Sequence, residues 1–143
     1  MMSAQERLER LEKLVDELHE RSHDTPIIVE GLRDVAALKK LGITRNVVPL
    51  NKGSSVIAFS EDIAKRHPKA IILTDWDRKG GHLARLLLDA LMGTDVKVDT
   101  DIRAKIVILS KKEIRDIESL PSLLSRLRRM ELLKSGERSV VDG

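Results

Sequence analysis

Three carboxylates follow two apolar runs of the chain and form a candidate site for a divalent cation. Glu30 comes directly after the run at 27–29, and Asp75 and Asp77 follow the run at 70–74. Side chains two residues apart on an extended segment project from the same face, so the two aspartates would point together. Converging carboxylates repel one another and raise at least one pKa unless a cation neutralises them. Oxygen-only ligands, few in number, favour Mg²⁺ over a caged Ca²⁺, with Mn²⁺ as an alternative.

Each motif alone has a simpler explanation. A glutamate at the end of a strand can cap the next helix, and the Asp-x-Asp pair can be a turn formed by Asx hydrogen bonding. A lone buried carboxylate is costly, and all three acids would share one edge of a sheet. Together they favour a metal site, with Glu30, Asp75 and Asp77 as its metal-binding and catalytic residues.

The elements that must position these acids can be predicted from the apolar pattern. Short apolar runs rich in β-branched residues alternate with amphipathic stretches, and they lie at 26–29, 46–50, 70–74 and 106–109. Buried parallel strands have this composition, and right-handed crossovers place helices on both faces of the sheet. We therefore predict an open, doubly wound, Rossmann-like α/β fold with about four parallel strands.

Both ends of the chain are predicted to be helical. Residues 1–25 would form an N-terminal helix whose leucine and valine stripe either makes a homodimer through a short coiled coil or, more commonly, packs on its own domain. Ser119 is the expected N-cap of a last helix, with Pro121 at its first position. Residues 121–143 are predicted to be this helix, ending near Leu133, followed by a frayed polar tail.

Ligands of such a sheet bind where the strands end at their carboxyl edge. Polar and charged residues gather in the loops expected there, whereas the loops at the opposite ends of the strands contain fewer of them. Basic side chains in these loops would hold phosphate oxygens, and the candidates are Lys52, Arg78, Lys79 and Lys112. The Gly80-Gly81 pair would open a helix whose electropositive N-terminus faces the same edge.

The order and spacing of these motifs resemble the Toprim domain. The sequence Ile27-Ile28-Val29-Glu30-Gly31, with Asp34, precedes Ile71-Ile72-Leu73-Thr74-Asp75-Trp76-Asp77-Arg78-Lys79-Gly80 by about 45 residues. Toprim domains occur in DnaG-type primases, topoisomerases, recombination proteins and nucleases that mature 5S ribosomal RNA. The similarity covers residues 26–118, and the domain would extend over 26–120. The overall size resembles that of small stand-alone archaeal Toprim proteins.

The resemblance implies a role for each matching residue. Asp75 and Asp77 would be the family's Mg²⁺-binding aspartates, and Glu30 its general acid or base, or a further ligand. Gly31 and Gly80 would be its structural glycines. The polar sequence at 51–54 resembles the loop after the family's second strand, and Asp116 and Glu118 lie where some members carry a further acidic segment.

Missing residue types narrow the function within that family. The chain has no Tyr for a topoisomerase-type intermediate and no Cys for the zinc module of a primase. We expect Mg²⁺-dependent phosphodiester hydrolysis of RNA or DNA, or binding by a non-catalytic scaffold subunit that needs a partner protein for chemistry. A nucleotide-binding regulator is less favoured because no glycine-rich phosphate loop is present.

The remaining motifs are explained mainly by ordinary structural roles. His19-Glu20-Arg21-Ser22-His23 matches the H-E-x-x-H pattern of zinc peptidases, but it is polar and lies at a helix end. Asp95, Asp99 and Asp101 lack EF-hand spacing and favour a solvated loop with a helix cap. Trp76 can stack on a base or pack on the sheet edge, and the arginines at 126–129 favour an ordinary charged helix face.

Composition sets the expected surroundings. A charged fraction of 34% beside a hydrophobic fraction of 41% is typical of a globular, strongly solvated protein. No apolar run approaches the roughly 20 residues that span a bilayer, and the N-terminus lacks the apolar centre of a secretion signal. We therefore expect a cytoplasmic protein with no membrane contact. The resemblance to Toprim domains implies RNA or DNA, and other nucleic-acid-processing proteins, as partners.

Overall fold

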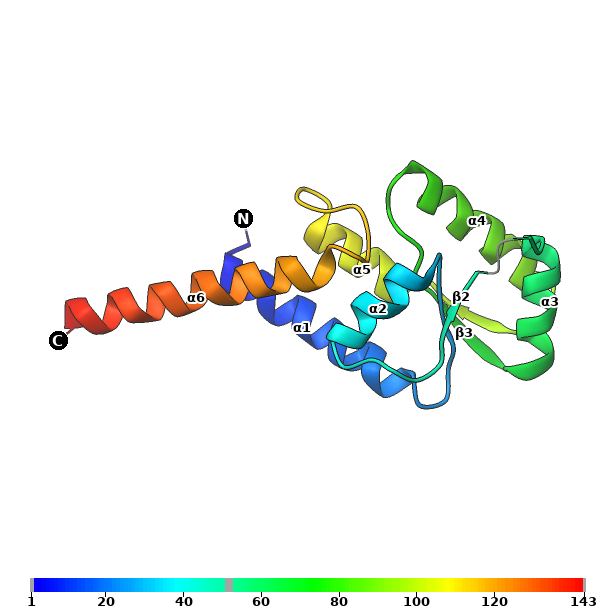
Figure 1. The fold of residues 1–143 in the computed structure, drawn as a ribbon, viewed down its shortest axis with the longest axis horizontal. Helices are drawn as coiled ribbons and strands as arrows, with labels where there is room; N and C mark the ends of the chain where they lie inside the picture. Colours follow the sequence, from blue (N-terminus) through cyan, green and yellow to red (C-terminus); the bar gives the residue numbers. More distant parts are fainter. Residues whose placement is uncertain (1, 51–52, 143) are drawn as a thin grey trace.

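The protein folds around a four-stranded parallel sheet, which confirms the predicted α/β class (Figure 1). The computed structural model describes residues 2–50 and 53–142. In chain order, the elements in these residues are α1 (Ala4–Arg21), β1 (Ile27–Val29), α2 (Leu32–Lys40), β2 (Val47–Pro49), α3 (Val56–Arg66), β3 (Lys69–Ile72), α4 (Arg78–Met92), β4 (Lys97–Asp99), α5 (Asp101–Ser110) and α6 (Leu120–Asp142).

The strand order is β2-β1-β3-β4, with every neighbouring pair parallel. The chain leaves β1 toward one edge of the sheet and later leaves β3 toward the other. The switch point therefore lies between β1 and β3, where Ile27 pairs with Ile71 and Ile28 with Ile72. Open α/β sheets bind ligands in the crevice at such a point.

Both faces of the sheet are covered. The face carrying Ile27, Val29, Ile71 and Leu73 shares one apolar cluster with α1, α2, α5 and α6. Residues Ile28, Ala70 and Ile72 share a second cluster with α3 and α4. Because side chains alternate along a strand, each of these buried strands contributes to both clusters. These strands are apolar at every position because both of their faces are buried.

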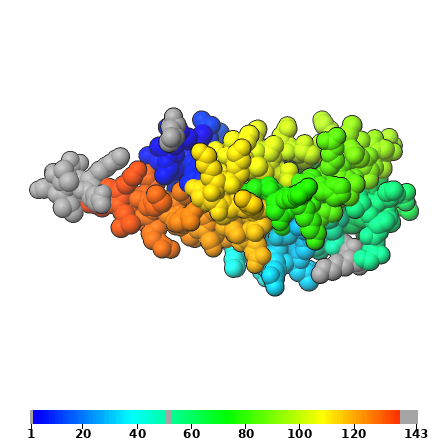
Figure 2. All heavy atoms as spheres, turned by 90° about the horizontal axis from the view of Figure 1, so that it is seen from above, coloured from blue at the N-terminus to red at the C-terminus, as the bar shows by residue number. Residues whose placement is uncertain are grey.

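Helix α1 packs within its own chain. Its apolar stripe, made of Leu8, Leu11, Leu14, Val15 and Leu18, is buried against α5 and α6. In the space-filling view of Figure 2, the blue N-terminal residues and the orange first part of α6 lie together at one end of the molecule. The alternative in which the stripe packs on its own domain therefore describes this structure.

The predicted fourth strand at 106–109 is wrong, because these residues belong to helix α5. Ile102, Ile106 and Leu109 recur at helical spacing and are buried, whereas Ile108 is 70% exposed. Strand β4 instead comes earlier and lies at the edge of the sheet, where two of its three residues are charged. Lys112 consequently follows a helix and not a strand.

Helix α6 begins one residue earlier and ends later than predicted. Leu120 is its first residue, and the Leu123 amide donates to the Ser119 carbonyl at its start. The helix continues to Asp142, so the expected end near Leu133 is wrong. No proline follows to stop it, and one glycine costs a helix only about 1 kcal/mol. Within the described residues, no helix is long and apolar enough to cross a membrane.

Candidate metal centre

Glu30 and Asp75 lie at the switch point of the sheet. Glu30 follows β1 directly, and Asp75 follows β3, the neighbouring strand. The ladder continues one residue past β3, because the Leu73 amide donates to the Ile28 carbonyl over 2.8 Å. The chain then turns away at Thr74 and Asp75. Both carboxylates therefore follow directly or closely after the two central strands, and packing in the apolar core fixes the positions of these strands.

Asp34 is the third member of the cluster. One carboxylate oxygen from each of Glu30, Asp34 and Asp75 lies within 4.8 Å of the other two. Asp34 occupies the first turn of α2 and is only 7% exposed. Its Oδ2 accepts a hydrogen bond from the Gly31 amide over 3.1 Å, which keeps the carboxylate close to the end of β1.

The cluster is electrostatically unfavourable when all its members are ionised. Burial raises the pKa of Glu30 to about 8, a side-chain hydrogen bond with Asp75 adds to the shift, and repulsion from Asp75, Asp77 and Asp34 adds further. Burial also raises the pKa of Asp34 to about 6, with repulsion from Asp75 the next contribution. Desolvation penalises the ionised form of each group, and like charges penalise it further.

These donors fit a divalent cation. The Oε1 atom of Glu30 is buried and has no hydrogen-bond partner among the described residues, which is unusual for a carboxylate. Mg²⁺ binds oxygen at about 2.1 Å, so its ligand oxygens lie at most about 4.2 Å apart. The carboxylate oxygens of the cluster lie within 4.8 Å of one another, which is close to that limit. A cation would also remove the repulsion among the three acids.

Gly80 allows the loop after β3 to fold back on itself. A Cβ atom at Gly80 would lie 2.1 Å from the Asp75 carbonyl oxygen, a distance that no side chain tolerates. The Thr74 hydroxyl donates to the Gly80 carbonyl over 2.8 Å and closes the same loop. Gly31 is different, because a Cβ there would meet nothing within 4 Å and its φ of −157° is ordinary extended backbone.

Asp75 is also held by the part of the chain that follows β4. The Arg103 guanidinium donates to the Thr74 and Asp75 carbonyls over 2.8 and 2.7 Å. The Ile117 amide donates to Oδ1 of Asp75 over 3.0 Å. Burial lowers the pKa of Arg103, while the nearby Asp75 and Glu30 carboxylates oppose that shift.

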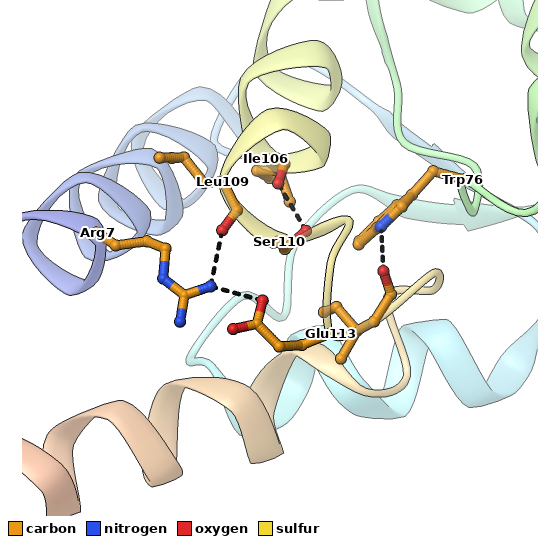
Figure 3. A network of polar contacts seen from close by, with 7 residues as sticks. Arg7, Trp76, Ile106, Leu109, Ser110 and Glu113 are labelled. Atoms are coloured by element: carbon orange, nitrogen blue, oxygen red, sulfur yellow. Dashed lines mark hydrogen bonds and ion pairs between the residues drawn. The ribbon is translucent and has the colours of Figure 1, made fainter. Parts of the chain in front are cut away.

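Trp76 anchors the same loop. Its indole Nε1–H donates to the Ile114 carbonyl over 2.8 Å, and its backbone amide donates to the Arg115 carbonyl. Figure 3 shows the indole pointing toward the loop that follows α5, beside Ser110 and Glu113. The ring also packs against the cluster formed by α1, α2, α5 and α6. Packing, the second of the two predicted roles, is therefore observed for Trp76, whereas base stacking stays a prediction.

A cleft of about 720 Å³ opens above the acids. Its walls include all three cluster members together with Arg33, Lys79 and Glu118. A smaller lobe of about 250 Å³ shares Glu30, Leu50 and Lys79 with it and extends over Phe59 at α3. The three acids and Lys79 therefore line the same cleft.

Comparison with known proteins identifies this arrangement. The domain family described as Toprim matches residues 25–109, which is more than half of the chain. The chain belongs to the Toprim family. Its acidic cluster and Gly80 lie within the matched residues, whereas Ile114, Arg115 and Ile117 lie beyond them.

Similar Toprim proteins of comparable length occur in archaea. A UPF0292 protein of Methanosarcina barkeri is 46% identical over 131 residues, covering 91% of this chain and 88% of that protein. The corresponding protein of Methanocaldococcus jannaschii is 38% identical over 125 residues, covering 87% and 98%. A solved structure of a protein from Aquifex aeolicus aligns with TM-score 0.64 and 29% identity, covering 75% of this chain and 94% of that one.

Not all residues of the Toprim motif enter the cluster. Asp77 is the N-cap of α4, and its Oδ1 accepts a hydrogen bond from the Gly80 amide over 2.7 Å. This is the turn that the Asp-x-Asp pair also predicts. A metal-binding role for Asp77 stays a prediction, supported by its repulsive effect on the pKa of Glu30.

The predicted phosphate-binding residues are placed unequally. Lys79 lines both lobes of the cleft. Arg78 is exposed beside it in the first turn of α4. Lys112 is exposed in the loop after α5 and does not line the cleft. Lys52 lies outside the described residues, so its predicted contact is not placed.

Asp34 is the site residue that sequence reasoning did not assign. It belongs to the Toprim-like segment, but its position three residues after Gly31 also suits a helix-capping carboxylate. The missing signal was burial, which no single-sequence pattern gives for a polar residue in the first turn of a helix. Its proximity to Asp75 depends on the pairing of β1 with β3.

The structural roles predicted for the histidine pair, for Asp99 and for the arginines at 126–129 agree with the structure. The His19 and His23 rings make an edge-to-face contact 5.5 Å apart at the end of α1, and neither belongs to the acidic cluster. Asp99 caps α5 by accepting from the Asp101 and Ile102 amides. Near the other end of the chain, Arg128 pairs with Glu12 on a solvated surface.

Proposed function

We propose that this protein carries out nuclease-like, divalent-metal-dependent phosphodiester chemistry on RNA or DNA in the cytoplasm. Mg²⁺ is the proposed ion, and Mn²⁺ a substitute. The observation that carries the proposal is the Oε1 atom of Glu30, which is buried and has no hydrogen-bond partner among the described residues. Glu30 lies close to two further carboxylates in a Toprim domain. A structural role alone gives no reason to keep such a group, because buried polar atoms are normally paired.

In the proposed reaction, different residues would bind the ion, bind the phosphate backbone and donate a proton. Glu30, Asp34 and Asp75 would hold the ion, which supplies a polarised phosphate and an activated water. Lys79 on the cleft wall would balance the charge of the phosphate backbone. Glu30 also retains a proton near neutral pH before an ion binds, so it can serve as a ligand or as a proton donor to the leaving oxygen.

The test compares two equivalent substitutions on labelled RNA and DNA with Mg²⁺ or Mn²⁺. Asp75→Asn keeps an oxygen for the Ile117 amide but removes the charge that the ion needs. We expect cleavage to fall by about a hundredfold or more, since ion binding supplies several kcal/mol. Asp99→Asn, at the end of β4, is the control and should cleave like the wild type. Equal activity of Asp75→Asn and the wild type would refute the proposal.

A third variant separates the two roles of Asp77. Asparagine caps a helix about as well as aspartate, so Asp77→Asn should keep the bond to the Gly80 amide. If Asp77 binds the ion, this variant loses Mn²⁺ affinity while its thermal stability stays near that of the wild type. If Asp77 only caps α4, both quantities stay unchanged.

A non-catalytic scaffold is the second candidate. Among the described residues that line the main cleft, Arg33 and Lys79 are the basic ones, whereas Glu30, Asp34, Asp75 and Glu118 are acidic. This balance favours weak intrinsic affinity for a polyanion. Retarded migration of labelled nucleic acid without cleavage, in either metal, would support the scaffold over the nuclease.

A further inference from the structure

Arg103 makes an unusual contact behind the acidic cluster. Its Nε and Nη2 atoms donate to the carbonyls of consecutive residues, Thr74 and Asp75, over 2.8 and 2.7 Å. Successive residues of an extended strand face opposite sides, so one guanidinium reaches both carbonyls only because the chain turns there. The planar fork of Arg suits this pair of acceptors, and a single ammonium does not reproduce it.

A second set of bonds holds the next residues of the same loop. Trp76 donates from its amide to the Arg115 carbonyl and from its indole to the Ile114 carbonyl, each over 2.8 Å. The Ile117 amide in turn donates to Asp75 Oδ1. These five bonds therefore come from α5 and the loop at 111–119, and none of them comes from β1 or α2, which carry the other two acids.

We infer that Arg103 is a positioning residue for the metal centre, acting with Trp76 to fix the Asp75 carboxylate opposite Glu30 and Asp34. The inference rests on the proposed metal site and deepens it. Because Oδ1 of Asp75 accepts the Ile117 amide, this carboxylate is held from the side of the loop at 111–119. Arg103 itself does not line the cleft, so it acts through Asp75 and not by touching a substrate.

Charge and position predict opposite effects at Arg103. A positive group near the cluster repels an incoming cation, so removal of its charge alone would strengthen metal binding. Loss of the fork would weaken binding, because Asp75 would no longer be held in place. Arg103→Lys keeps the charge and loses the fork, and it therefore isolates the positioning effect. Arg21→Lys is the matched control, since Arg21 is a partly buried arginine that holds Asp99 at the end of β4.

The experiment measures Mn²⁺ dissociation constants of the full chain at a temperature where circular dichroism shows every variant folded. We expect Arg103→Lys to bind Mn²⁺ about tenfold more weakly than the wild type, because mutating a residue that orients a metal ligand commonly lowers metal affinity by that much. Arg21→Lys should bind Mn²⁺ as tightly as the wild type. Trp76→Phe keeps an aromatic ring, although a smaller one, and loses the indole donor, and we expect Mn²⁺ affinity to fall by about threefold. This variant keeps the test available if Arg103→Lys fails to fold.

A second readout separates local positioning from general stability. The Ile117 amide reports the bond to Asp75, so its hydrogen exchange should accelerate in Arg103→Lys without metal, while the Ile28 and Ile72 amides stay protected. Equal Mn²⁺ affinity of wild type and both variants overturns the inference alone. Acceleration of all core amides to the same extent also overturns it. A wild type that binds no Mn²⁺ overturns the proposed function and the inference together.

Discussion

Two sites that lie at the ends of different strands of one sheet treat their carboxylates in opposite ways. At the end of β4, Oδ2 of Asp99 accepts a hydrogen bond from the Arg21 guanidinium over 2.6 Å. Its other oxygen, Oδ1, caps the first turn of α5 by accepting from the Asp101 amide. At the ends of β1 and β3, Glu30, Asp34 and Asp75 face one another. Here Arg103 is directed at backbone carbonyls and not at the carboxylate oxygens.

The pKa shifts follow from this difference. Burial would raise the pKa of Asp99, but the Arg21 bond and two backbone amides outweigh it and lower the pKa. Burial raises the pKa of Glu30 to about 8, and its neighbours are acids that add to the rise. Asp99 is matched by donors of the protein itself, whereas the cluster of Glu30, Asp34 and Asp75 is one whose repulsion a bound cation would relieve.

The largest expected effect comes from filling the space behind Asp75. Gly80→Ala places a methyl group against the Asp75 backbone, so the loop must shift. We expect the free energy of unfolding to fall by about 3 kcal/mol in urea denaturation, and Mn²⁺ binding to be lost. Asp99 pairs with Arg21 and with the first amides of α5, so it should keep its ion pair with Arg21.

Gly81 provides the control for that substitution. It lies in the same turn of α4, but a Cβ there meets nothing within 4 Å. Gly81→Ala should therefore raise the free energy of unfolding by about 0.5 kcal/mol through helix propensity. Similar losses in the two variants would show that the helix start, and not the contact with Asp75, is responsible.

The second effect is a pH dependence of the metal-free protein. Glu30 has a higher pKa in the folded state, about 8, than its ordinary 4.5, so the folded state binds more protons between these values. Its contribution to stability is complete below about 4.5 and is lost as pH rises to about 8. We expect a decrease of about 2 kcal/mol in urea denaturation across this window, allowing for solvent screening.

Two measurements test the origin of that decrease. Glu30→Gln should remove it above pH 6, leaving a smaller decrease below about 6 that belongs to Asp34. Saturating Mg²⁺ at pH 8 should restore the stability of the wild type, because binding to the folded state stabilises it. A wild-type profile that stays flat from pH 4.5 to 8 would contradict the assignment.

The fold was largely predictable because its central strands are wholly apolar and alternate with amphipathic helices. The exception is instructive. Ile106, Val107, Ile108 and Leu109 form an apolar run typical of a strand, yet their neighbour Ile102 completes a helical spacing. The real β4 is an edge strand of three residues, Lys97–Asp99, and a solvated edge does not require an apolar run.

The candidate site was predictable only in part. The order of Glu30 and Asp75 at strand ends indicated that the two would meet, because parallel strands end at one edge of the sheet. Asp34 and Arg103 were not assigned, since their roles depend on burial and on contacts between segments far apart in the chain. Asp77 shows a remaining ambiguity, because one Asp-x-Asp pattern predicts both a helix cap and a ligand.

The smallest expected effect has the opposite sign to that at Glu30. Asp99→Asn keeps an oxygen for the Asp101 amide but loses the charge that attracts Arg21. At pH 7 the free energy of unfolding should fall by about 1 kcal/mol, as for a partly exposed ion pair. Because the folded pKa of Asp99 lies below its ordinary 3.8, this cost should shrink as pH falls below that value. Glu30→Gln should instead stabilise the metal-free protein at pH 8. Equal signs for the two substitutions at that pH would remove the distinction between a carboxylate that the protein neutralises and one that it leaves for a cation.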